Sequence, residues 1–181
     1  MFNLFTHKMP FQKNIRLGLI AIGITALIAT GCGKPAESAY QKQVPVPAAQ
    51  WAYAFQPEFT FDIPDTTASY KVYLIFRYDA AFEFSNIWLR SWVKQPGDSV
   101  YSEGKRIETV LLAADGSRLG NNVGGVYEYK VQLKAGQDYA PFTKPGQYGV
   151  KLEQIMRKNP LVGLINVGLR IERYDAKKPV S

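Results

Sequence analysis

From Trp51 onward, apolar and polar residues alternate along much of the chain, which is the period-2 pattern of strands that bury one face. The longest example begins at Tyr70. Apolar residues occupy every second position from there to Tyr78, whereas Lys71 and Arg77 fall on the opposite face. The alternation predicts strands at residues 59–63, 70–78, 86–94, 106–113, 126–133, 147–157 and 165–173, with a shorter one at 51–55.

Turn sequences separate these segments, namely DGSRLG from Asp115, LKAGQ from Leu133 and KPGQ from Lys144. Glycine supplies the positive φ that tight turns between antiparallel strands require. We therefore predict an all-β fold, a single jelly-roll-like antiparallel β-sandwich with about seven or eight strands. The segment 86–94 is apolar on both faces and is expected to lie centrally in its sheet, and residues 154–164 are expected to include a helical turn.

The first part of the chain has the pattern of an export signal. Lys8, Lys13 and Arg16 precede an uncharged run over residues 17–30, which is shorter than the roughly 20 residues a membrane-spanning helix needs. The run ends in the sequence ATGC, which resembles the lipobox of bacterial lipoproteins. We predict cleavage before Cys32 and attachment of acyl chains, palmitate among them, to that cysteine.

These features divide the chain into four parts. We predict a signal peptide at 1–31, a lipid-anchored flexible linker at 32–50, the β-sandwich at 51–175 and a disordered tail at 176–181. Removing the signal lowers the formal net charge from +7 to +4, because it takes away three basic residues and no acidic ones. No concentrated basic run remains, so nucleic-acid binding is not expected.

The residue types of the mature chain limit its chemistry. Its single histidine, His7, lies in the signal, and its only thiol is the predicted anchor. Ser-His-Asp and Cys-His nucleophiles and His/Cys zinc sites are therefore excluded. The acidic residues are scattered singly, apart from Asp62 and Asp65, which Pro64 interrupts. We predict no enzymatic activity, no cofactor, no metal and no small-molecule substrate.

Three stretches together resemble the gliding motility lipoprotein family GldH. They are YKVYLIFRYDAAFEFSNIWL from Tyr70, DGSRLGNNVGGVYEY from Asp115, and PGQYGVKLEQIMRKNPLVGLINVGLRIE from Pro145. The resemblance implies a non-catalytic outer-membrane lipoprotein that serves gliding and type IX secretion by supporting other envelope lipoproteins. The residues that follow Cys32 contain no acidic export run, which favours a domain that faces the periplasm.

Five residues are candidates for structural or interaction roles: Arg77, Asn86, Trp88, Asp115 and Arg157. Arg77 and Arg157 would either grip an acidic partner or form structural ion pairs, with solvated or structural roles favoured. Asn86 would hydrogen-bond the backbone of an adjacent loop. The glycines that follow Asp115 favour hairpin geometry over a phosphate cradle, because no helix start follows them.

Two classes of function remain open. The favoured one is an accessory or scaffold lipoprotein that binds other envelope proteins. The alternative is a lipid-tethered glycan-binding module, which an exposed row formed by Trp88, Trp92 and Tyr73 would favour. Aromatic residues at alternating strand positions more often pack between sheets, so we expect Trp88 and Trp92 to belong to the core.

Overall fold

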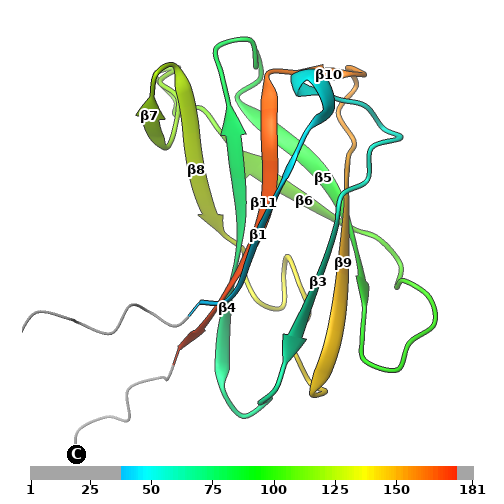
Figure 1. The fold of residues 1–181 in the computed structure, drawn as a ribbon. Coiled ribbons are helices and arrows are strands. Elements are labelled where there is room, and N and C mark those ends of the chain that lie inside the picture. Colours follow the sequence, from blue (N-terminus) through cyan, green and yellow to red (C-terminus); the bar gives the residue numbers. More distant parts are fainter. Residues whose placement is uncertain (1–37, 175–181) are drawn as a thin grey trace, which may run out of the picture. The chain divides into compact units, whose positions relative to one another are not determined.

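The computed structural model describes residues 38–174, which form an antiparallel β-sandwich of two sheets (Figure 1). One sheet has five strands in the order β1-β11-β4-β8-β7, and the other has four in the order β3-β9-β5-β6. The bounds of the five are β1 Ser38–Pro45, β11 Leu164–Tyr174, β4 Ser69–Tyr78, β8 Val126–Gln132 and β7 Asn121–Val123. Those of the four are β3 Glu58–Ile63, β9 Gly146–Gln154, β5 Asn86–Lys94 and β6 Lys105–Val110. The predicted all-β sandwich is confirmed.

Two very short strands, β2 Gln50–Trp51 and β10 Leu161–Val162, pair with each other beside the main sheets. A single 3-10 turn, η1 Pro47–Ala49, precedes β2. Within residues 38–174, no helix is long and apolar enough to span a membrane. The predicted signal peptide, Cys32 and the tail 176–181 lie outside the described residues.

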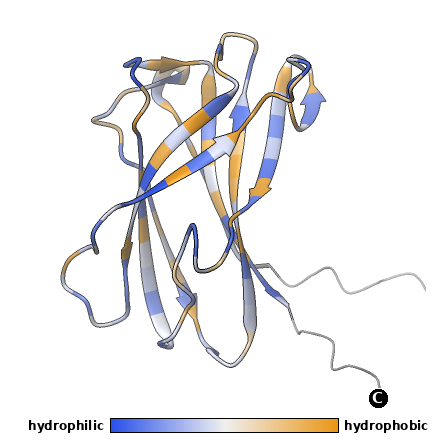
Figure 2. Ribbon diagram, turned by 180° about the vertical axis from the view of Figure 1, so that it is seen from behind, coloured by the Kyte–Doolittle hydropathy of each residue, from blue (hydrophilic) through white to orange (hydrophobic). Residues whose placement is uncertain are grey.

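The core lies between the two sheets and follows the alternation seen in the sequence. Figure 2 shows hydrophobic and hydrophilic residues taking turns along the strands. On β4, Leu74, Phe76 and Tyr78 are fully buried, as the pattern predicted. They belong to one apolar cluster with the inward residues of the other sheet, such as Ile87 and Leu89 of β5. Strand β5 has a neighbour on each side, which confirms its central position.

The predicted linker at 32–50 is wrong from residue 38 onward, because Ser38–Pro45 forms edge strand β1. It pairs with β11 in a register that runs from Ser38↔Glu172 to Pro45↔Asn166. We did not predict this strand because the charged Lys42 interrupts the apolar residues at its inward positions. Charged residues at inward positions are common on edge strands. The Lys42 ammonium instead donates a hydrogen bond to the Glu58 carbonyl of β3, at 3.4 Å.

The expected helical turn within 154–164 is also absent, because a buried glutamine takes over the hydrogen bonds of that segment. Gln154 has no exposed surface. Its amide donates to the carbonyls of Trp51 and Lys158, and its side-chain oxygen accepts from the Met156 N–H at 2.8 Å. The segment 155–160 therefore bends instead of coiling. Strand β7 was missed because its three residues are all exposed and carry no alternation.

Candidate functional site

The candidate site is the outer surface of the four-stranded sheet. On β5, the buried residues Ile87, Leu89 and Ser91 point to the core. Trp88 and Trp92 occupy the alternate positions and therefore point outward. We call this surface the aromatic face and define it by residues that share its outward side. They are Trp88, Arg90 and Trp92 of β5, Arg106 of β6, Lys151 of β9 and Tyr101 of the 95–104 segment.

Cations on the aromatic face lie over aromatic rings. The Arg106 guanidinium is 4.8 Å from the centre of the Trp88 ring. The Lys151 ammonium is 4.8 Å from the centre of the Trp92 ring and 5.1 Å from that of Tyr101. Such contacts are worth about 0.5–1 kcal/mol at exposed sites and orient the side chains that make them. The rings are thereby held in place before any partner arrives.

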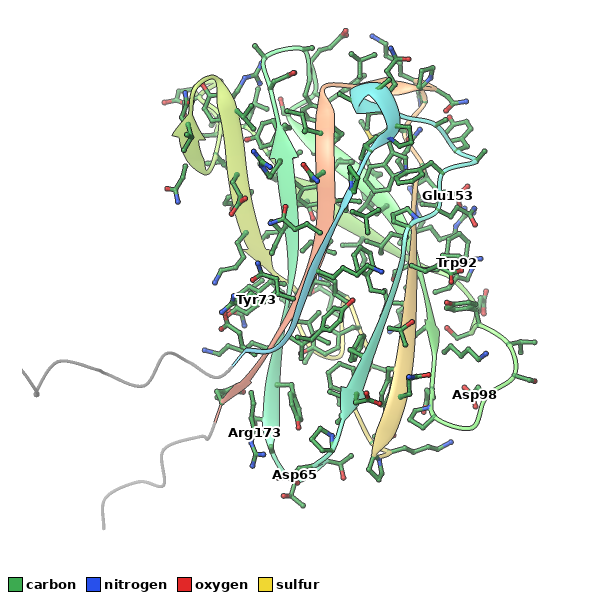
Figure 3. The ribbon with its side chains drawn as sticks, viewed as in Figure 1. Asp65, Tyr73, Trp92, Asp98, Glu153 and Arg173 are labelled. Atoms are coloured by element: carbon green, nitrogen blue, oxygen red, sulfur yellow. The ribbon has the colours of Figure 1, made fainter. Side chains whose placement is uncertain are left out.

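Only some of the cations on the aromatic face form an ion pair with a carboxylate. Arg90 pairs with Glu153, with 3.6 Å between Nη1 and the carboxylate oxygen. Figure 3 shows Glu153 and Trp92 on the side of this sheet that faces away from the other sheet. Among the described residues, neither Arg106 nor Lys151 forms an ion pair. These two positive charges therefore remain available to an acidic group on a partner.

The loop between β5 and β6 lies against the same surface. A Cβ atom at Gly104 would sit 2.7 Å from Arg90 Cδ and 2.8 Å from Trp92 Nε1, so a residue without a side chain lets the loop approach. Beside Tyr101 is a polar cleft of about 490 Å³, whose lining includes Glu58, Lys94 and Gly149. Burial and the nearby Glu58 carboxylate raise the pKa of Tyr101.

The outer surface of the five-stranded sheet has a different character. We call it the ion-paired face and define it by the polar residues of its strands. They are Gln41, Gln43, Tyr73, Arg77, Glu128, Lys130, Arg170 and Glu172. Its ion pairs link different strands: Arg77 of β4 pairs with Glu128 of the neighbouring β8 at 3.8 Å, and Lys130 of β8 reaches across β4 to Glu172 of β11 at 3.3 Å.

Glu172 is the centre of the ion-paired face. Burial alone would raise its pKa, but hydrogen bonds from Arg170 and Lys130 and the positive charge of Lys130 outweigh that effect, so the pKa of Glu172 lies below its ordinary value. The Arg170 Nε donates to the carboxylate at 2.6 Å. Beneath these side chains Ile75 is only 3% exposed, although it points away from the core between the sheets. The polar side chains cover it without help from a partner.

The structure places the five predicted candidates in different surroundings. Arg77 belongs to the ion-paired face, and Trp88 to the aromatic face. Asn86 donates its side-chain N–H to the Glu108 carboxylate, not to a loop backbone as expected. Asp115 accepts hydrogen bonds from the N–H and hydroxyl of Ser117 in an exposed turn, which lowers the pKa of Asp115.

Arg157, the fifth candidate, lies on the exposed segment after β9 and makes no ion pair among residues 38–174. Arg77, in contrast, forms an ion pair with Glu128 on the ion-paired face. The two arginines therefore do not form one binding site for an acidic partner. The expectation that Trp92 belongs to the core is wrong, because it has the opposite strand parity to the buried Ile87 and Leu89. Trp88 has the same outward parity, but part of its side chain packs against the apolar cluster, as expected. Both indoles are half-buried at the outer surface.

Sequence reasoning did not single out Tyr101, Arg106 or Lys151 as partners of the tryptophans. Each comes from a segment other than β5, and only the cross-strand register places Lys151 opposite Trp92. Cationic residues at outward strand positions were the only signal in the sequence. No group of three or more His, Cys, Asp or Glu side chains suited to a metal ion occurs within the described part of the chain.

Comparison with known proteins gives a consistent family assignment. A model of the GldH lipoprotein family matches residues 38–171. A gliding motility lipoprotein GldH homolog of Christiangramia forsetii is 30% identical over 133 residues, which cover 70% of this chain and 79% of the homolog. The gliding motility lipoprotein GldH of Flavobacterium johnsoniae is 27% identical over 125 residues, which cover 64% of this chain and 74% of that protein.

Among solved structures, the chain resembles a carbohydrate-binding module, CBM28, that is specific for non-crystalline cellulose. The two share 12% sequence identity with a TM-score of 0.44, over 76% of this chain and 74% of the module. A likeness of this strength establishes neither a shared fold nor a shared ligand.

Proposed function

The chain belongs to the GldH lipoprotein family, and from this premise we propose that it is a non-catalytic outer-membrane lipoprotein of the gliding motility and type IX secretion machinery. It acts there as an accessory or scaffold component that binds other envelope lipoproteins. Membership in a family of gliding motility lipoproteins supports an envelope-anchored role. The secretion partners and the periplasmic orientation are part of the proposal.

The observation that carries the proposal is the composition of the aromatic face. Trp, Tyr and Arg are the residue types enriched at the energetic centres of protein interfaces. Here Trp88, Trp92 and Tyr101 lie outward beside Arg90 and Arg106. Cations already hold the rings, so a partner would order few side chains on binding, which reduces the entropy cost of association.

Lipid attachment at Cys32 is the second element of the proposal. Several acyl chains, at about 0.8 kcal/mol for each buried methylene, anchor a protein far more firmly than one chain does. Tethering raises the effective concentration of the domain near membrane partners, so even a modest interface becomes occupied. The sandwich then supplies a binding surface, and the anchor supplies its location.

A glycan-binding module remains the second candidate, because a polar cleft of about 490 Å³ adjoins Tyr101 on the aromatic face. Sugar rings stack on open aromatic faces. The ammonium of Lys151 lies over both Trp92 and Tyr101, and Arg106 lies over Trp88. A sugar would have to displace these cations, whereas an acidic protein segment would pair with them. Protein binding is therefore favoured.

The test is affinity purification from gently solubilised outer membranes, followed by mass spectrometry. Arg106→Ala removes a cation of the aromatic face, and Arg77→Ala is its matched control on the ion-paired face. We expect gliding or type IX secretion components to co-purify with the wild type and with Arg77→Ala, and to be depleted with Arg106→Ala and with the unanchored Cys32→Ala. Equal recovery with both arginine variants contradicts the proposed surface, and recovery of polysaccharide alone favours the glycan-binding module.

A further inference from the structure

The position of β1 restricts where the domain can sit relative to its anchor, an argument that rests on the proposed acylation of Cys32. The sheet begins at Ser38, so only residues 33–37 separate it from Cys32. Six Cα steps of about 3.3–3.6 Å each give a maximum reach of roughly 22 Å. The ten residues of β4 alone extend over about 33 Å. One end of the sandwich is therefore held close to the bilayer.

The register identifies that end. Ser38 pairs with Glu172 near the end of β11, and the last residue of β11, Tyr174, pairs with Ser69 at the start of β4. Figure 3 shows Asp65, Asp98 and Arg173 toward this same end of the sandwich. We call it the anchor end. It comprises Ser38, Tyr174 and the connecting segments 64–68, 95–104 and 133–145.

The anchor end has side chains of the kinds found at membrane interfaces, where aromatic rings and lysines flank apolar groups. Val100 is 72% exposed in the 95–104 segment. Tyr174 is 40% exposed, and the Lys71 ammonium lies 4.8 Å from the centre of its ring. Four further lysines at or beside this end form no ion pair within residues 38–174, namely Lys94, Lys105, Lys134 and Lys144.

Three of the acidic residues at this end are occupied in turns. Asp98 accepts from the Gln95 N–H at 3.2 Å, and Asp138 accepts from the Lys134 N–H at 2.7 Å. Asp65 accepts from Thr67 and pairs with Arg173 at 2.9 Å. These three carboxylates are thus directed to neighbouring donors, and Glu103 is the further acidic residue of the 95–104 segment. The lysines of this end carry the positive charge that lipid phosphates attract.

We propose that the anchor end is a lipid-facing surface, which rests on the bilayer that holds the acyl chains and places Val100 at headgroup level. The opposite end, formed by segments 79–85, 111–125 and 155–163, then lies away from the membrane. The aromatic face extends between the two ends and stays accessible to neighbouring envelope proteins. The acyl chains thereby fix the direction of the domain as well as its location.

Two exposed valines provide a matched test. Val100 is at the anchor end, and Val123 lies in the β7–β8 hairpin at the opposite end, with exposures of 72% and 79%. Because the acylated Cys32 is the only native cysteine, a thiol-reactive fluorophore labels only the cysteine introduced by Val100→Cys or Val123→Cys. The labelled mature lipoproteins are placed in phosphatidylethanolamine and phosphatidylglycerol vesicles that carry a headgroup spin label as quencher.

We expect the probe at position 100 to lose most of its emission and the probe at position 123 to keep it. Equal quenching at both positions, or stronger quenching at 123, overturns the proposal. Flotation of the protein with vesicles is scored separately, with Cys32→Ala as the unanchored control. Failure of the wild type to float refutes the lipid anchor itself, and with it this orientation. Flotation with equal quenching refutes the orientation alone.

Discussion

The two outer surfaces of this sandwich both carry charged residues but arrange them differently. On the ion-paired face, Arg77, Lys130 and Arg170 each meet a carboxylate of the same surface. On the aromatic face, Arg106 and Lys151 lie over aromatic rings and form no ion pair among the described residues. One surface is satisfied internally, whereas the other keeps unmet charge beside large apolar rings. The exposed fractions of the charged side chains would not distinguish the two surfaces, whereas the groups that each charge contacts do.

The largest effect is expected on binding when Trp92 is truncated. Trp92→Ala removes an outward ring that Lys151 and Arg90 hold in place. Truncation of an interface tryptophan at a hot spot costs about 2 kcal/mol or more, so we expect roughly 30-fold weaker binding. The affinity is measured by titrating the purified partner against the detergent-solubilised lipoprotein. Unchanged affinity would remove Trp92 from the interface.

A pair of glycines compares how closely each face is packed. A Cβ at Gly168, on the five-stranded sheet, would lie 2.8 Å from Gln43 Cγ and 2.9 Å from the Lys42 carbonyl oxygen. At Gly149, on the outward side of β9 beside Tyr101, the nearest atom is the Tyr101 hydroxyl oxygen at 3.2 Å. Overpacking typically costs about 1–3 kcal/mol, so we expect that loss for Gly168→Ala and less than about 1 kcal/mol for Gly149→Ala. Urea unfolding measures both, and equal losses would contradict the difference in packing.

The pH dependence of stability is expected to depend on Glu172. Its folded-state pKa lies below the unfolded value of about 4.3, so its ionised form stabilises the fold above that value and the stabilisation is lost as pH falls through the folded pKa. Glu172→Gln lacks this contribution, which we place at roughly 1–2 kcal/mol at neutral pH. Unfolding curves of wild type and variant should therefore converge between about pH 5 and pH 3. A constant gap across that range would show that the charge is not responsible.

The smallest effect is expected at the Arg77–Glu128 pair. The two side chains are 43% and 52% exposed and lie 3.8 Å apart. Exposed pairs contribute about 0–1 kcal/mol, and salt weakens them further. Arg77→Ala should lower the free energy of unfolding by less than about 1 kcal/mol at low salt and leave partner binding intact. A large loss of either would mean that the ion-paired face does more than satisfy its own charges.

The sequence predicted a strand and its buried face correctly wherever apolar residues occupy only one of the two alternating sets of positions. On β8, the half-buried Tyr127, Tyr129 and Val131 alternate with exposed charged and polar residues, so the inward set was evident. On β5 both parities carry large apolar side chains, and the pattern alone does not decide which set is inward. The expectation that Trp92 belongs to the core is the error that hid the aromatic face.

The site also depends on distances that no single strand encodes. Register between β5 and β9 puts Lys151 opposite Trp92, and a one-residue slip would move it to the other surface. Strand β1 was hidden because Lys42 interrupts its inward series, so the tether was predicted to be longer than it is. The family resemblance supplied the functional expectation, whereas the surface that would serve it became visible only in the structure.

The most direct test of the account is site-specific photo-crosslinking in living cells. A benzophenone side chain replaces Val110, an outward residue of β6 on the side of the aromatic face that is 51% exposed, or Arg77 on the ion-paired face, and crosslinked products are identified by mass spectrometry. We predict crosslinks from position 110 to another envelope protein of the gliding or secretion machinery, and none from position 77. Crosslinks from position 77 alone would contradict the assignment of the aromatic face as the binding surface.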